Sequence, residues 1–93
     1  MTLLQNLESR LACALETALG EATPPNITAA ADLRFGDYQS NSAMVLAKRK
    51  KTNPRALAQQ IIDAIDLGEI ATADIAGPGF INFRILPEAY AAP

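Results

Sequence analysis

The sequence predicts an α+β domain, in which a small, mostly antiparallel sheet is covered on one face by about three helices. Three observations lead to this fold class. A leucine-rich segment with a four-residue repeat opens the chain, an Asn-Pro pair at 53–54 opens another helical segment, and two alternating apolar segments flank Gly77-Pro78-Gly79. The 93 residues fit one domain, residues 1–93, and leave no room for a second.

The first expected element is a helix from Thr2 to Leu19. Its leucines recur every four residues and so share one apolar face: Leu3, Leu7, Leu11, Leu15 and Leu19. Thr2 and Gln5 have the spacing of a capping box, and Gly20 is suited to end the helix. Cys13 is the one cysteine, which excludes an internal disulfide, and its place within the apolar stripe predicts a small core residue.

The middle of the chain carries weaker signals. Residues 27–35 form the first candidate strand, although the alanines at 29–31 are poor strand formers. Gly36-Asp37 is interpreted as a turn, and Ser40 or Asn41 can cap a second helix that continues into basic residues from Lys48.

A third helix has a clear start signal, because Asn53 can serve as N-cap and Pro54 fits the first helical position. Gly68 is expected to end this helix in the left-handed conformation. Residues 70–76 are then a candidate strand that leads to Gly77-Pro78-Gly79.

The segment from Phe80 to Leu86 is the most strand-like in the chain. Because side chains alternate across a strand, it has two distinct faces. The core face is expected to carry Ile81, Phe83 and Ile85. The other face, which points toward solvent or another layer, is expected to carry Phe80, Asn82, Arg84 and Leu86.

The composition argues against catalysis by this chain alone. It has no histidine and a single cysteine, which removes most acid–base and nucleophile–base pairs and leaves no zinc or iron–sulfur site. We therefore expect no catalytic residue and no metal. No apolar run approaches a membrane span and no signal peptide is evident, so a cytoplasmic protein without a membrane partner is the default expectation.

Phe80, Asn82 and Arg84 together have the chemistry for binding a nucleotide. An aromatic ring can stack on a base, an amide can bond to a base edge, and an arginine can pair with phosphate. Gly77 and Gly79 would let a partner approach the backbone closely. The alternative is structural, with Phe80 packed on a helix and Asn82 bonded to a loop carbonyl.

Basic residues are concentrated in one segment although the net charge is −2. Five of the eight arginines and lysines lie between positions 48 and 55, and they are candidate phosphate contacts: Lys48, Arg49, Lys50, Lys51 and Arg55. The alternative is a solvated helix end, where the helix dipole also favours basic side chains.

Two motifs make the sequence recognisable. One runs from Phe35 through Gly36-Asp37-Tyr38-Gln39-Ser40 to Asn41, and the other from Ile75 through Gly77-Pro78-Gly79 to Arg84, with Asn53-Pro54-Arg55 between them. In this order and separation they closely resemble the N-terminal additional domain of bacterial-type arginyl-tRNA synthetase. The resemblance covers essentially the whole chain.

The resemblance implies a domain that contacts the D-loop at the outer corner of arginine-accepting tRNA. The family's aromatic-x-amide pair on a late strand matches Phe80 and Asn82, and Gly77, Gly79 and Arg84 are supporting candidates. Three further residues belong to the family motif: Asp37, Tyr38 and Gln39. They either contact the RNA or form the turn that joins the strand and the helix.

The sequence departs from the whole enzyme because it lacks the His-x-Gly-His signature of the family's ATP site. ATP and arginine would bind a catalytic domain of the same polypeptide that is missing from this chain, as is the anticodon-binding domain. The chain is therefore interpreted as a domain excised from a larger synthetase. The alternatives are a protein-docking module on a catalytic body and a free-standing RNA-binding domain.

Overall fold

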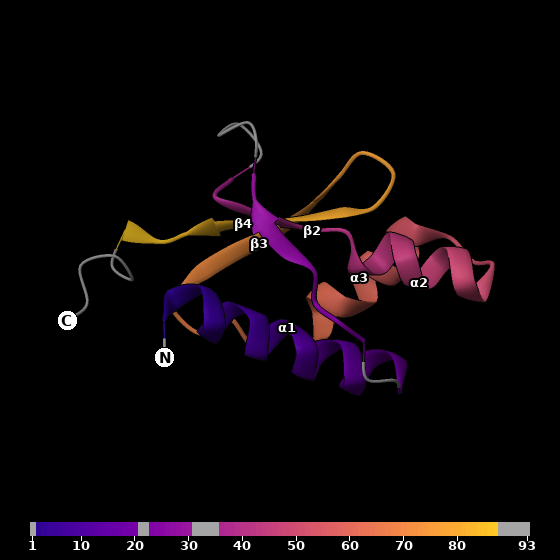
Figure 1. The fold of residues 1–93 in the computed structure, drawn as a ribbon, viewed down its shortest axis with the longest axis horizontal. Helices are drawn as coiled ribbons and strands as arrows, with labels where there is room; N and C mark the ends of the chain where they lie inside the picture. The colour runs from indigo at the N-terminus through magenta and orange to yellow at the C-terminus, as the bar shows by residue number, and fades with distance from the viewer. Residues whose placement is uncertain (1, 21–22, 31–35, 88–93) are drawn as a thin grey trace.

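The computed structural model describes residues 2–20, 23–30 and 36–87 (Figure 1). The elements in chain order are α1 (Leu3–Leu19), β1 (Ile27–Ala29), β2 (Tyr38–Ser40), α2 (Ser42–Lys50), α3 (Pro54–Ala64), β3 (Ala71–Ala76) and β4 (Phe80–Ile85). The strands form one antiparallel sheet in the order β1-β2-β4-β3, with the helices below and to the right of it in Figure 1. The predicted α+β class is confirmed.

Helix α1 begins and ends as its local sequence predicts. The capping box of Thr2 and Gln5 is formed in both directions, which satisfies two backbone donors of the first turn. Gly20 caps the other end with φ 72° and donates to the carbonyl of Glu16. The prediction for Cys13 is wrong, because this residue lies on the exposed side of the helix. Ala14 takes the buried position beside it.

Strand β2, between the predicted turn at Gly36-Asp37 and α2, was not predicted from the sequence. Tyr38, Gln39 and Ser40 pair with β1 on one side and with β4 on the other, so these three residues lie inside the sheet. Only β1 is formed by the described part of the candidate strand 27–35, and residues 31–35 lie outside the described residues. A three-residue strand carries too little local signal to be distinguished from a turn.

Helix α3 begins as predicted and ends earlier than predicted. Asn53 accepts hydrogen bonds from the backbone N–H groups of Arg55 and Ala56, with Pro54 at the first helical position. The helix ends at Ala64, so Gly68, with φ 55°, serves the following turn instead of capping the helix.

The hydrophobic core lies between one face of the sheet and the helices. As predicted, Ile81, Phe83 and Ile85 point into it from β4. They pack in one cluster with side chains from the three helices, among them Leu7, Leu11, Leu15, Leu46, Leu57 and Ile61. Helix α3 contacts α1, α2 and the sheet, so burial of this shared cluster links the elements.

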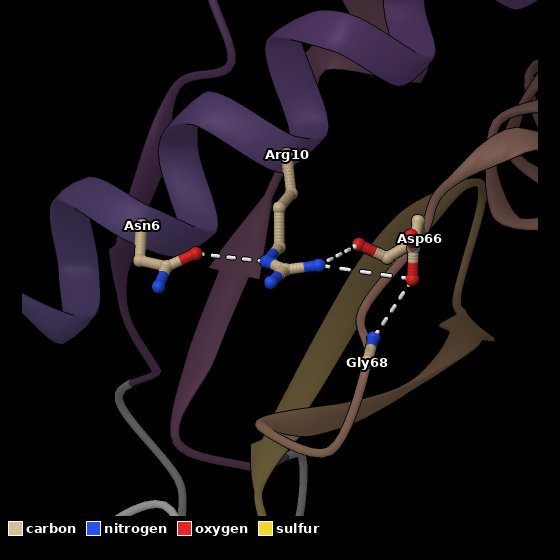
Figure 2. A network of polar contacts seen from close by, with 4 residues as sticks. All are labelled: Asn6, Arg10, Asp66 and Gly68. Carbon is tan, nitrogen blue, oxygen red and sulfur yellow. Dashed lines mark hydrogen bonds and ion pairs between the residues drawn. The ribbon is translucent and has the colours of Figure 1, made fainter.

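A polar network joins α1 to the loop that leads into β3, as Figure 2 shows. The guanidinium of Arg10 donates to Asn6 Oδ1 at 2.8 Å and to the carbonyl of Asp66 at 2.6 Å. Asp66 Oδ1 lies 3.7 Å from Arg10 Nη1 and accepts from the N–H of Gly68. Because the Asp66 side chain is 91% exposed, the network orients the loop rather than contributing much free energy.

Gly36 stands where β2 approaches β4 too closely for any side chain. Its φ is 102°, and a Cβ atom would lie 2.7 Å from the carbonyl oxygen of Phe83. The adjacent Asp37 then bonds to β4 twice, through its N–H to Phe83 O at 2.8 Å and through its Oδ2 to Ile85 N at 2.7 Å. This junction sets the alignment of β2 on β4.

We expect Gly36→Ala to lower the free energy of unfolding by roughly 2 kcal/mol or more, because it adds a backbone clash to an unfavourable φ. Gly20→Ala is the matched control. Its φ of 72° is also positive, but no atom lies within 4 Å of the new Cβ, so only about 1 kcal/mol is expected. Urea unfolding of both variants measures the difference, and an equal or smaller loss for Gly36→Ala would contradict the proposed junction.

Candidate nucleic-acid interface

The face of the sheet opposite the core carries a row of polar side chains. The strand registers place Thr28, Gln39, Asn82 and Asp74 side by side across all four strands. Thr28 and Asp74 are exposed, as are Thr72 and Arg84 on the same face. Residues beneath a helix would not be exposed in this way, so this face, here called the open face, is available to a ligand.

Asn82 is the exception on the open face, because its residue surface is only 5% exposed. Its side-chain oxygen accepts a hydrogen bond of 2.9 Å from Gln39 Nε2 on β2. Among its neighbours on this face, Asp74 and Arg84 are exposed and Gln39 is partly buried. Asn82 is therefore held in place while the residues beside it remain accessible.

Phe80 lies at the end of the open face that adjoins Gly77-Pro78-Gly79. The ring is partly buried, and Gly77 is so close that a Cβ there would lie 3.6 Å from Phe80 Cδ2. A hollow of about 220 Å³ is lined by Phe80, Gln39, Ala76, Gly77 and Pro78. Four of these five residues are nonpolar or glycine, and a lining of this kind is suited to contact with the flat face of a nucleotide base.

A second, larger hollow lies on the other side of Phe80. Its volume is about 730 Å³, and Phe80 and Gln39 line it together with residues of α1, β1 and the segment before β1: Glu8, Pro24, Pro25, Asn26, Ile27, Thr28 and Asn41. Phe80 and Gln39 are the two residues that line both hollows. They therefore lie at the centre of the hollowed surface.

The two glycines of the turn have different roles in the structure. Gly77 is exposed and lines the smaller hollow. Gly79 is buried, and a Cβ there would lie 2.8 Å from Pro54 Cβ and 3.2 Å from Met44 Cγ. Glycine is required at position 79 by packing against α2 and α3, so close approach by a partner, which the sequence suggested, is not needed to explain it.

Of the five candidate phosphate contacts, one lies near the turn between β3 and β4, and four lie at the end of α2. Arg55 donates from its guanidinium to the carbonyl of Gly77, which holds a cation beside the smaller hollow. Lys48, Arg49 and Lys50 form the last turn of α2, and Lys51 caps it in the left-handed conformation. All four are exposed, and Figure 1 places the end of α2 on the same side of the strands as the turn between β3 and β4.

The structure gives different positions to the three motif residues whose roles the sequence left undecided. Asp37 is used by the backbone of β4, as described above. Tyr38 packs against the core cluster and is partly buried. Gln39 points to the open face and contacts Asn82. Of the three, Gln39 is thus the one placed at the candidate site, and the sequence showed it only as part of a motif because β2 was not recognised as a strand.

Arg84 shares the open face with Asn82, two residues further along β4, and it is exposed.

Within the described residues no group of three or more His, Cys, Asp or Glu side chains could hold a metal ion. In that same part of the chain, no helix combines the length and the apolar character needed to cross a bilayer.

Comparison with known proteins relates the chain to one group of enzymes. A family model described as the arginyl tRNA synthetase N terminal domain matches residues 5–85. The arginine–tRNA ligases of Laribacter hongkongensis and Chromobacterium violaceum are 48% and 46% identical to the chain over 89 residues. Each alignment covers 95% of this chain and 16% of the relative, so the chain spans a small part of the length of these ligases.

Solved structures give the same relation. The arginyl-tRNA synthetase of Thermus thermophilus matches with a TM-score of 0.77 and 31% identity, over 95% of this chain and 15% of that one. The enzyme from Plasmodium falciparum matches with the same TM-score at 20% identity, over 90% of this chain and 16% of that one, and this second likeness concerns the fold alone.

Proposed function

Because the chain belongs to the family of arginyl-tRNA synthetase N-terminal domains, as the match over residues 5–85 shows, we propose that it binds the D-loop of arginine-accepting tRNA. In this proposal it orients the tRNA for ATP-dependent arginylation by a catalytic domain of the same polypeptide, in the cytoplasm. ATP and arginine bind that catalytic domain, and this chain contributes recognition without chemistry.

One observation carries the proposal: Phe80 lines a hollow of about 220 Å³, and Asn82 lies two residues further along β4 on the same face of the sheet. A base exposed in a loop can stack on Phe80, and the held amide of Asn82 can bond to its edge. In the described part of the chain, Thr72, Asp74 and Arg84 of this face are exposed, which favours a ligand at this face over the structural alternative.

The basic residues supply the phosphate contacts in this proposal. Arg55 is fixed at the turn, next to the stacking position, and is the best placed of them. Lys48, Arg49, Lys50 and Lys51 extend the positive charge along the end of α2. The net charge of −2 means that these local contacts, rather than a general attraction, must provide the electrostatic part of binding.

Phe80→Ala, made in the synthetase that carries this domain, should raise the KM for tRNA by roughly 5- to 100-fold, the equivalent of a stacking free energy of about 1–3 kcal/mol per base. Asn82→Ala should raise it by about 2- to 10-fold, as expected for one hydrogen bond, and kcat should stay nearly unchanged in both. Steady-state arginylation measures both constants. Thr72→Ala, an exposed change on the same face, is the control and should behave as the wild type.

Unchanged tRNA kinetics in both variants would exclude the open face as the tRNA contact. A fall in kcat without a change in KM would equally contradict a role confined to binding.

Replacing Lys48 and Lys51 by glutamine should make tRNA binding less dependent on salt. Each lost phosphate contact lowers the slope of log K against log salt concentration by about 0.7–0.9. Equilibrium binding at several salt concentrations measures the slope. Arg10→Gln removes a charge from the Asp66 network instead, and its slope should equal that of the wild type. An unchanged slope for the double variant would identify Lys48 and Lys51 as a solvated helix end.

A further inference from the structure

We propose that Gln39 is a positioning residue, which fixes the side-chain amide of Asn82 with its NH₂ group toward the ligand. The group read by Asn82 is then a hydrogen-bond acceptor on the base. This inference rests on the proposed function, because it names a supporting residue for the same site and the kind of hydrogen-bonding group on the base that Asn82 contacts.

The side-chain amides of Gln39 and Asn82 contact each other across β2 and β4. Gln39 and Asn82 are direct partners in the register of β2 and β4, and Gln39 Nε2 donates to Asn82 Oδ1 at 2.9 Å. The oxygen and the nitrogen of an amide diverge from the same carbon atom. When the oxygen faces β2, the NH₂ group must face away from β2, toward the β3 side or outward from the sheet.

The other neighbour of Asn82 favours the same orientation. Asp74 is its direct partner on β3, and its exposed carboxylate lies on the same face. An ionised carboxylate only accepts hydrogen bonds, and it repels a carbonyl oxygen turned toward it. The row therefore places a donor on the β2 side and a carboxylate on the β3 side of Asn82, and the amide oxygen lies on the side of the donor.

Fixing this amide matters for recognition because an unrestrained asparagine offers a donor and an acceptor equally. Either group could then contact the base, so an asparagine free to rotate would discriminate little between a donor and an acceptor on the base. Asn82 is 5% exposed, and Gln39 is anchored on a strand paired on both sides. Gln39 also lines both hollows beside Phe80, so it supports the amide at the ligand position itself.

Two substitutions of Gln39 test the proposal in the synthetase that carries this domain. Gln39→Glu replaces the donor with a carboxylate, so Asn82 should donate its NH₂ group to residue 39 and turn its oxygen toward the base. Gln39→Met removes the donor without adding charge. Gln60→Glu is the control for charge, since Gln60 carries the same side chain, is exposed on α3 and lines neither of the two hollows.

The probe is an arginine-accepting tRNA transcript in which single D-loop nucleotides are made abasic, one at a time. The ratio of dissociation constants for abasic and intact tRNA gives the contribution of each base, and a general loss of affinity cancels in this ratio. At the base that is read, the ratio should fall by about 2- to 10-fold in Gln39→Glu and Gln39→Met, as expected for one hydrogen bond. Gln60→Glu should leave the ratio unchanged.

Base analogues at that nucleotide then test polarity. Deleting one acceptor from the base should weaken binding to the wild type by about 2- to 10-fold and leave Gln39→Glu unaffected. Wild-type sensitivity to donor deletion alone would overturn the inference, as would unchanged ratios in both Gln39 variants while Phe80→Ala still lowers the ratio. If no D-loop base contributes in the wild type, the proposed function fails and this inference fails with it.

Discussion

The pairing of β4 with β2 is the constraint on which the rest of the structure depends. It joins residues that are 43 positions apart at the Gln39–Asn82 bond, and it places β4 between β2 and β3. Because the side-chain period of a strand is two, a slip of one residue would move Phe83 out of the core and Asn82 into it. The close approach at Gly36 and the two bonds of Asp37 to β4 hold the register in place.

This register creates the core and the candidate site together. One face of β4 joins the helices, and the other presents Phe80 and Asn82 on rigid backbone. The adjoining turn is rigid as well, because Gly79 packs against Pro54 and the guanidinium of Arg55 holds the carbonyl of Gly77. Recognition groups on such elements are oriented before a ligand arrives, which lowers the entropic cost of binding.

The sequence was sufficient to predict the elements whose signals are local. The capping box of α1, the Asn53-Pro54 start of α3 and the alternation in β4 each lie within a few residues, and the structure confirms them. It was insufficient where partners are distant. Strand β2 exists because β1 and β4 flank it, and the Gln39–Asn82 bond requires the register. Cys13 was misplaced because a helical stripe has edges, and one position decides between core and solvent.

The central claim is that the open face of β4 contacts a D-loop nucleotide of arginine-accepting tRNA. The most direct measurement replaces Phe80 by a photoreactive benzophenone amino acid in the synthetase that carries this domain, irradiates its complex with tRNA, and maps the crosslinked nucleotide by primer extension. We expect crosslinking confined to the D-loop, and weaker crosslinking when Asn82 is also replaced by alanine. Crosslinks in the anticodon or acceptor arm, or none in the D-loop, would contradict it.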